Sequence, residues 1–340
     1  MNKMVAFMLV LFGTAAAGCS AQAPTAIPPT APSATAVPRK LGTIRFSLTG
    51  NLKVLDMPRL MALDSLKEQG YTVEQTNLAS SDLVPIALTR GDIEFGSSDT
   101  SVMWSAIAKG ADIRTIVGRT NTTFFLVTKQ ELQTCGDLND RPIAFNSSTS
   151  VGSLMFQKYL KQNCPGITPQ MLLINDSNSR MASLRAGSID GAWLELDAWL
   201  QLKRQEPGKF RILIDFAKEF PQVQFSSFSV RQAWAEQNPE TVKDFIRALL
   251  MAQRRVIANP QLLRDGIVKY LSIDSSSARE SADAYLSLNV WDANGGLTRE
   301  NVQYMLEFLT SDGNLPAGLK PEGVADLSYL NAVLDEMGRK

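Results

Sequence analysis

The chain has 340 residues, 44% of them hydrophobic, which is enough to bury the cores of two domains. Its 34 basic and 34 acidic side chains balance, and this balance argues against a nucleic-acid partner. The chain contains no histidine, the commonest general base and metal ligand, so triad hydrolysis and zinc chemistry are poor hypotheses. We therefore expect neither a metal nor a cofactor.

Residues 1–19 have the pattern of an export signal. Lys3 supplies a positive start, residues 4–12 form an apolar run too short for a membrane span, and small residues precede Cys19. This order resembles the signal of bacterial lipoproteins, in which the cysteine is lipidated; the alternative is an ordinary secretory signal cut near the alanines. Residues 20–41, rich in Pro, Thr and Ala, predict a disordered tether. We expect an extracytoplasmic protein that is anchored to the membrane through Cys19.

Strands and helices alternate from residue 41 onward, which predicts an α/β fold with largely parallel sheets. The predicted strands are 41–48, 71–74, 92–95, 113–117, 123–128, 142–145, 171–174, 189–194 and 211–216, with 224–230 as a return crossing. The predicted helices are 57–68, 83–89, 102–109, 151–162, 179–186 and 198–203, and then 239–258, 260–270, 274–286, 299–309 and 326–337.

One pattern occurs twice. Residues 88–95 and 184–191 share a spacing of Leu, Gly, Ile and an acidic residue, in which a helix closed by glycine leads at once into a short strand. One copy falls in each half of the α/β region. The repeat predicts two domains of like topology, whose equivalent strand ends lie on either side of a cleft.

Two cysteines remain after Cys19. Cys135 precedes the predicted strand 142–145, and Cys164 ends the helix after it. In an exported protein two such thiols favour a disulfide, which here would tie together the ends of one βα unit. The alternative is two buried free cysteines.

Several short segments together carry a family resemblance. They are residues 88–96, 109–113, 184–192 and the helix start at 238–240, with 137–144 as the entry to the second domain. Their order and spacing resemble the periplasmic substrate-binding proteins of ABC importers, in the sulfonate, nitrate, taurine and thiamine-precursor branch. Asp140 stands where that family usually has glycine.

The resemblance implies a type II periplasmic-binding-protein fold with two lobes and a hinge of two crossovers. Lobe one is expected at 42–123 plus 230–340 and lobe two at 124–229, with crossings near 123–124 and 226–228. A small-molecule ligand is then held between the lobes and delivered to permease subunits. The resemblance also implies a monomer without enzymatic activity.

The candidate ligand contacts are polar residues at strand ends on the cleft side. They are Thr49, Asn51, Ser98, Asp99 and Thr100 in lobe one, Thr120 and Asn121 near the crossover, and Asn146, Ser147, Ser148, Thr149, Trp193 and Glu195 in lobe two. Each has a structural alternative: Ser98 as a helix cap, Asn51 as a turn former and Trp193 as a core residue.

The charge of the ligand stays open. The free N–H groups of the helix that begins near Val151 favour an anion. Glu195 and Asp99 would repel an anion but would accept hydrogen bonds from an amine or from an N–H-bearing heterocycle. The ring of Trp104 or Trp193 would then stack on such a ligand.

Two basic residues bear on the same question. An inward-facing Arg180 would favour an anion, and Glu195 could instead face solvent or pair with Arg180 or Arg185. A sulfonate, nitrate or taurine-like ligand and a thiamine-pyrimidine-like ligand therefore both remain open.

Two other functions share this architecture. A ligand-sensing lipoprotein that serves a membrane signalling partner would have the same tether and cleft. A thiamine-pyrimidine synthase of the same fold consumes a histidine, which this chain lacks.

Overall fold

The computed structural model describes residues 41–49, 52–147, 150–311 and 313–340. The predicted signal peptide, the predicted lipidation site Cys19 and residues 20–40 of the predicted tether lie outside this part, and so do Asn51, Ser148 and Thr149. Within the part described, no helix combines the length and apolar character that a membrane crossing requires.

The first sheet contains five strands in the order β2-β1-β3-β10-β4. They are β1 (Thr43–Thr49), β2 (Thr72–Leu78), β3 (Phe95–Asp99), β4 (Ile113–Asn121) and β10 (Gln224–Arg231). β10 is antiparallel to both of its neighbours, whereas β1 is parallel to β2 and β3. The first βα units supply α1 (Met57–Glu68), α2 (Leu83–Arg90) and α3 (Thr100–Ala108), and a 3-10 turn, Val54–Asp56, precedes α1.

The second sheet repeats this arrangement in the order β7-β6-β8-β5-β9. Its strands are β5 (Phe124–Lys129), β6 (Pro142–Phe145), β7 (Gln170–Leu173), β8 (Gly191–Glu195) and β9 (Phe210–Asp215). β5 is antiparallel to β8 and β9, while β6 is parallel to β7 and β8. The helices are α4 (Val151–Asn163), α5 (Ser177–Arg185), α6 (Leu196–Gln205) and α7 (Phe216–Glu219), with a 3-10 turn at Cys135–Leu138.

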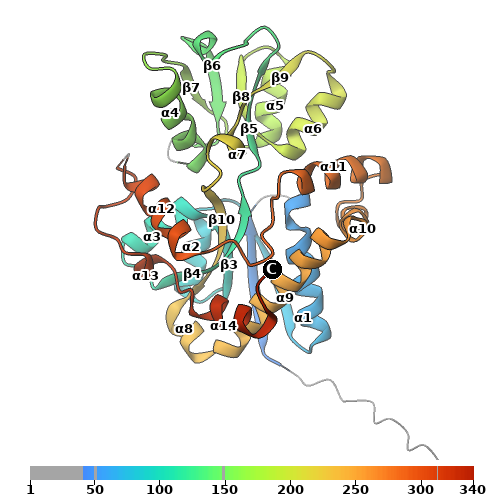
Figure 1. Cartoon of the computed structure of the whole chain (residues 1–340), viewed down its shortest axis with the longest axis vertical. Helices are drawn as coiled ribbons and strands as arrows, with labels where there is room; N and C mark the ends of the chain where they lie inside the picture. The colour runs from blue at the N-terminus through green and yellow to red at the C-terminus, as the bar shows by residue number, and fades with distance from the viewer. Residues whose placement is uncertain (1–40, 50–51, 148–149, 312) are drawn as a thin grey trace, which may run out of the picture. The chain divides into compact units, whose positions relative to one another are not determined.

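The two sheets have the same topology, as the repeated sequence pattern predicted. In each sheet the fourth position is taken by the antiparallel strand that carries the chain across from the other, β10 in the first sheet and β5 in the second. Figure 1 shows these two strands passing between the sheets. We call the first sheet with its helices the first lobe, and the second sheet with α4–α7 the second lobe. The predicted two-lobed α/β architecture is confirmed.

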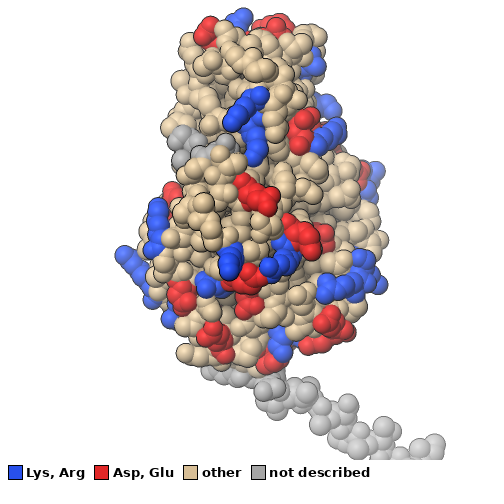
Figure 2. Space-filling model, turned by 60° about the vertical axis from the view of Figure 1, so that its left-hand side comes forward, with Lys and Arg blue, Asp and Glu red and all other residues tan. Residues whose placement is uncertain are grey.

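Helices make up most of the chain after β10. They are α8 (Gln232–Gln237), α9 (Pro239–Ala258), α10 (Pro260–Leu271), α11 (Ser275–Ser287), α12 (Arg299–Thr310), α13 (Pro321–Val324) and α14 (Ser328–Met337). α9 packs on α1, and its Phe245 ring lies 4.5 Å from Phe95 and 5.8 Å from Phe46 in the core of the first lobe. On the face seen in Figure 2 acidic and basic side chains are interspersed, in keeping with the balanced composition.

Several predicted strand limits were wrong for one shared reason. β3 covers 95–99 rather than 92–95, and β4 continues to Asn121 rather than ending at 117. β10 is a full strand of the first sheet, so the return from the second sheet precedes Gln224, whereas it was expected near 226–228. These strands carry hydroxyl residues such as Ser97 and Ser227, a residue type that is typical of loops, but both side chains are buried in the sheet.

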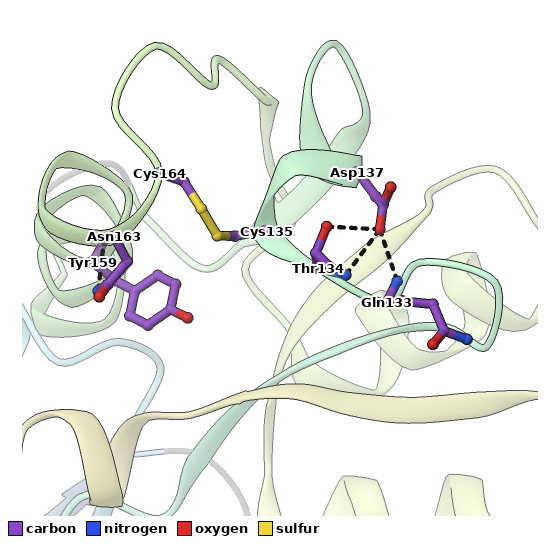
Figure 3. The surroundings of a disulfide bond; sticks show 7 residues. All are labelled: Gln133, Thr134, Cys135, Asp137, Tyr159, Asn163 and Cys164. Carbon is purple, nitrogen blue, oxygen red and sulfur yellow. Dashed lines mark hydrogen bonds between the residues drawn. A yellow bond between two sulfur atoms is a disulfide. The ribbon is translucent and has the colours of Figure 1, made fainter.

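A disulfide joins Cys135 and Cys164, whose Cα atoms are 6.3 Å apart (Figure 3). Cys135 begins the 3-10 turn that precedes β6, and Cys164 directly follows α4. Asp137 accepts hydrogen bonds from the backbone N–H groups of Gln133 and Thr134 and so fixes the turn that presents Cys135. The bridge closes the β6–α4 unit at its two ends, as the sequence predicted.

Candidate ligand-binding site

The end of β4 and the start of β10 lie side by side where the chain crosses between the lobes. Ser226 of β10 is opposite Asp99 on one side and Thr120 on the other, and the Thr120 and Ser226 hydroxyls are 2.9 Å apart. On the second lobe, Phe124 at the start of β5 pairs with Glu195 at the end of β8. The carboxyl ends of the parallel strands in both sheets therefore adjoin the two crossings, which is where ligands bind in open α/β sheets.

The edge of the first sheet is rich in buried hydroxyl groups. Thr100 is fully buried at the start of α3, and its hydroxyl has no hydrogen-bond partner among the described residues; the same holds for Thr122 at the first crossing. Ser98 donates to the Ser81 carbonyl and caps no helix. Asp99 is the residue before α3 but makes no side-chain capping bond to it. The first turn of α3 thus keeps backbone N–H groups without a side-chain cap.

The start of α4 is organised by internal hydrogen bonds. Ser150 is the N-cap and accepts from the Ser153 N–H at 3.3 Å, while its own hydroxyl donates to Asn146 Oδ1 at 2.8 Å. The Ser153 hydroxyl donates to the Ser147 carbonyl. Ser150 and Asn146 thus have a clear structural role as well as a place at the carboxyl end of β6.

Glu195 makes an ion pair that the sequence reasoning did not foresee. Its two carboxylate oxygens lie 2.6 and 2.5 Å from Nζ of Lys53, in the segment between β1 and α1. Glu195 is 8% exposed, so the pair joins the lobes through a largely desolvated carboxylate. The alternative that Glu195 pairs with Arg180 or Arg185 does not hold, because Arg185 pairs with Glu206 and the Arg180 guanidinium donates to backbone carbonyls.

Asp197, two residues further on, forms a second polar contact between the lobes. It accepts from the Tyr285 hydroxyl of α11 at 2.9 Å and from the backbone N–H of Val54. Desolvation raises the pKa of Asp197 to about 6, although the Tyr285 hydrogen bond acts in the opposite direction. The neighbouring Glu195 carboxylate adds to the increase.

This raised pKa predicts a pH-dependent contribution to stability. An aspartate in the unfolded chain titrates near pH ~3.9, so between about pH 4 and 6 the folded state holds more protons at Asp197 than the unfolded state does. The free energy of unfolding should therefore fall as pH rises through this window. Asp197→Asn should remove this pH dependence. The free energy of unfolding of the variant relative to that of the wild type should therefore rise by roughly 1–3 kcal/mol from pH 4.5 to pH 7.5. Urea denaturation of both proteins across this range measures the difference; a difference that does not change with pH would contradict the prediction.

Trp193 and Trp104 belong to the core, which corrects the expectation that either ring stacks on the ligand. Trp193 is 1% exposed and stacks on Phe124 at 4.4 Å, and a Cβ built on Gly152 would lie only 2.3 Å from its ring. Trp104 is fully buried and donates to the Thr115 hydroxyl. Neither ring has a face left for a ligand.

Arg180 faces inward but acts on the backbone. It is 2% exposed, and its guanidinium donates to the carbonyl oxygens of Trp193, Ile174 and Asn175 at 2.7–2.8 Å. Burial lowers its pKa to about 10, which leaves it charged at neutral pH. Arg180 thus fixes the ends of β7 and β8, and most of its donors are already used.

The structure brings together some of the expected contacts. Asp99 of β3 and Thr120 of β4 lie on either side of Ser226 of β10, and Glu195 lies beside Phe124 at the first crossing. Thr49 ends β1 on the same edge. Asn121 is the last residue of β4, and its side chain donates to the Asn289 carbonyl. Lys53 was missed because it is 142 residues from Glu195 and carries no motif.

The C-terminal helices add contacts between the lobes on two sides. On one side, Arg204 of α6 pairs with Glu280 of α11 at 2.6 Å. On the other, Lys158 of α4 donates to the Ser311 hydroxyl at 3.0 Å and lies 4.6 Å from the centre of the Phe308 ring. Among the described residues no group of three or more Cys, Asp or Glu side chains is arranged to hold a metal ion.

These features define the class of the fold. The ligand-binding component of an ABC-type import system from Staphylococcus aureus superposes with a TM-score of 0.72 at 12% identity, covering 86% of this chain and 99% of that structure. The alkanesulfonate-binding protein of Xanthomonas axonopodis pv. citri superposes with a TM-score of 0.65 at 16% identity, covering 84% and 98%. The chain therefore has the periplasmic-binding-protein fold.

The family follows from the sequence itself. Residues 66–262 match the NMT1/THI5 like family, and the chain belongs to that family. A curated relative, the taurine-binding periplasmic protein of Escherichia coli (strain K12), is 28% identical over 202 residues. That alignment covers 58% of this chain and 61% of the relative.

Proposed function

We propose that this protein is an extracytoplasmic solute-binding protein that captures a small polar ligand between its lobes and delivers it to an ABC importer. The proposal is carried by one observation: two sheets of identical topology present the carboxyl ends of their parallel strands at the two crossings. Membership of the NMT1/THI5 like family and the similarity to a taurine-binding periplasmic protein support it. The role is binding and not catalysis; the histidine that a thiamine-pyrimidine synthase consumes is missing from the chain.

The Lys53–Glu195 pair favours a zwitterionic ligand, such as an aminosulfonate. Its ammonium group can take the place of Lys53 beside the Glu195 carboxylate, while its anionic group is received by Lys53 and by N–H groups at the starts of α3 and α4. A simple anion that bound Lys53 would draw it away from Glu195 and leave the Glu195 carboxylate without a cation. The proposed contacts are the polar strand-end residues predicted from the sequence, with Trp193 removed and Lys53 added.

A matched pair of ligands tests this assignment. Taurine and ethanesulfonate differ only in the amino group, so Glu195→Gln should weaken taurine binding by about ten-fold or more and leave ethanesulfonate unchanged or slightly tighter. Titration calorimetry on the wild type and the variant measures both affinities. Equal losses for the two ligands would exclude Glu195 as the ammonium acceptor.

A thermal-shift panel tests the wider ligand class. Sulfonates, nitrate, taurine, pyrimidines and riboflavin cover the branch that the family suggests, and a ligand that binds the folded state alone raises the melting temperature. We expect a shift with at least one of the sulfonates. If no member of the panel shifts the protein, the proposed ligand class is wrong.

We further propose that the protein is exported, lipidated at Cys19, tethered by residues 20–41 and monomeric. The lipobox-like order of residues 15–19 supports the anchor. Mass spectrometry of the N-terminal peptide from membrane-extracted protein should show a diacylglyceryl-modified Cys19; an unmodified peptide that begins after the alanines would indicate an ordinary secretory signal.

A further inference from the structure

A cavity of about 690 Å³ lies on the first lobe, outside the set of proposed cleft contacts. Its walls come from α2, from α3, from the end of α12 and from the segment that follows it; we call it the α2–α3 groove. Its lining includes Asp82, Ile86, Arg90, Ser101, Val102 and Lys109. None of the cleft residues proposed above belongs to this lining. Its volume is in the range of sites that bind small organic molecules.

The middle of the groove is apolar and open to solvent. Ile86 of α2 is 46% exposed, and Leu83, one turn earlier, is 40% exposed. Val102 of α3 and Leu309 near the end of α12 form the facing walls. Exposed branched side chains beside a cavity leave apolar surface in water, which an apolar ligand body would cover.

The ends of the groove differ in charge. α2 leads into β3 and α3 leads out of it, and the parallel crossovers require both helices to run against that strand. Arg90, the last residue of α2, and Lys109, directly after α3, are therefore at the same end. Within the described part of the chain neither cation has an ion-pair or side-chain hydrogen-bond partner, so this end offers two charges to an anion.

The other end holds a buried, unused hydroxyl. Ser101 in the first turn of α3 is 7% exposed and lines the groove, and its oxygen has no hydrogen-bond partner among the described residues. A buried hydroxyl without a partner carries a free-energy cost that a bound polar group would remove. Asp82 lies on the rim at this same end and disfavours a second negative group there.

We propose that the α2–α3 groove is a second ligand site, which takes an elongated apolar anion with its charged group between Arg90 and Lys109 and its body along Ile86 and Val102. α2 has 8 residues and is about 12 Å long, which sets the length of the body. A neutral hydrogen-bonding group at the far end of the ligand would meet Ser101. The occupant is a soluble medium-chain or aromatic carboxylate.

Titration calorimetry of the full chain with decanoate, 1-decanol and 10-hydroxydecanoate tests the site. Decanoate should bind with one-to-one stoichiometry and at least about ten-fold more tightly than 1-decanol, because only the carboxylate meets the two cations. The Arg90→Gln/Lys109→Gln variant should remove that difference, and Ile86→Glu should abolish binding. The matched control, Lys161→Gln/Lys203→Gln, removes two exposed lysines of the second lobe and should bind like the wild type. Ser101→Ala should leave the affinity for decanoate unchanged and should remove the tighter binding of 10-hydroxydecanoate relative to decanoate.

Several results would overturn the proposal. No decanoate binding by the wild type, or equal affinity for decanoate and 1-decanol, would refute an anion site in the groove. A loss of decanoate affinity in Lys53→Gln together with full binding by Ile86→Glu would place the ligand in the cleft. Sedimentation with phosphatidylglycerol vesicles tests a membrane source of the same chemistry: co-sedimentation that depends on Ile86 without binding of free decanoate would assign the groove to lipid instead.

Discussion

Trp193→Ala is expected to lower the free energy of unfolding by about 3–5 kcal/mol, the range for removal of a large buried aromatic side chain. The ring is 1% exposed and lies between β5, α4 and α7, with its centre 4.4 Å from that of Phe124 and 4.9 Å from that of Phe216. Its removal opens a cavity where the second lobe supports the start of α4. Urea denaturation followed by circular dichroism measures the loss.

Two further variants separate packing from other effects. Gly152→Ala places a methyl group 2.3–2.7 Å from the Trp193 ring, so overpacking should cost on the order of 1–3 kcal/mol. Gly323→Ala is the matched control, because a Cβ there has no neighbour within 4 Å. Trp199 is half-buried, so Trp199→Ala should cost less stability than Trp193→Ala. If Trp193→Ala lowers the free energy of unfolding by less than Trp199→Ala does, Trp193 is not the packing centre of this lobe.

Removal of the disulfide is expected to have the second large effect. Cys135 and Cys164 are 29 residues apart, and closing a loop of this length restricts the unfolded chain by roughly 3–4 kcal/mol. The double variant Cys135→Ser/Cys164→Ser should lose that stability. The wild type in excess dithiothreitol should lose the same amount without any change of sequence, which guards against a misfolded variant.

The effect of the bridge on ligand binding should be small. It ties the end of α4 to the turn before β6, away from the start of α4, where Asn146 and Ser150 lie. Changes at two sites that are far apart and share no partners have nearly independent effects. Ligand affinity should therefore change less than two-fold under conditions in which the reduced protein remains folded. Equal stability of the oxidised and reduced proteins in denaturant would contradict the prediction.

The fold was predictable where local chemistry is unambiguous. Gly91 and Gly187 end α2 and α5 in the left-handed conformation, each with φ 77°, and each is followed by a strand of the expected topology. Glycine adopts this conformation without strain, so the repeated Leu-Gly-Ile-acid pattern located both units. The strands β5, β6 and β8 were also predictable from the sequence. They are buried on both faces and therefore appear in the sequence as short, nearly continuous apolar runs.

Other features had no local signal. β3, β4 and β10 carry buried serine and threonine residues, and a hydroxyl in a strand is indistinguishable by pattern from one in a loop. The Lys53–Glu195 and Asp197–Tyr285 contacts join segments 142 and 88 residues apart, so only the folded chain brings them together. The strand-end position of Trp193 predicted a ligand contact, whereas the absence of a side chain at Gly152 leaves room for its ring in the core.

Hydrogen–deuterium exchange with and without saturating taurine, or the strongest ligand of the thermal-shift panel, tests most directly that ligand is held between the lobes. We predict protection in peptides of both lobes, around Ser98 to Thr100 in the first and around Asn146 to Ser150 and Glu195 in the second, with little change in the α2–α3 groove. Protection confined to one lobe, or located in peptides away from these strand ends, would contradict the account.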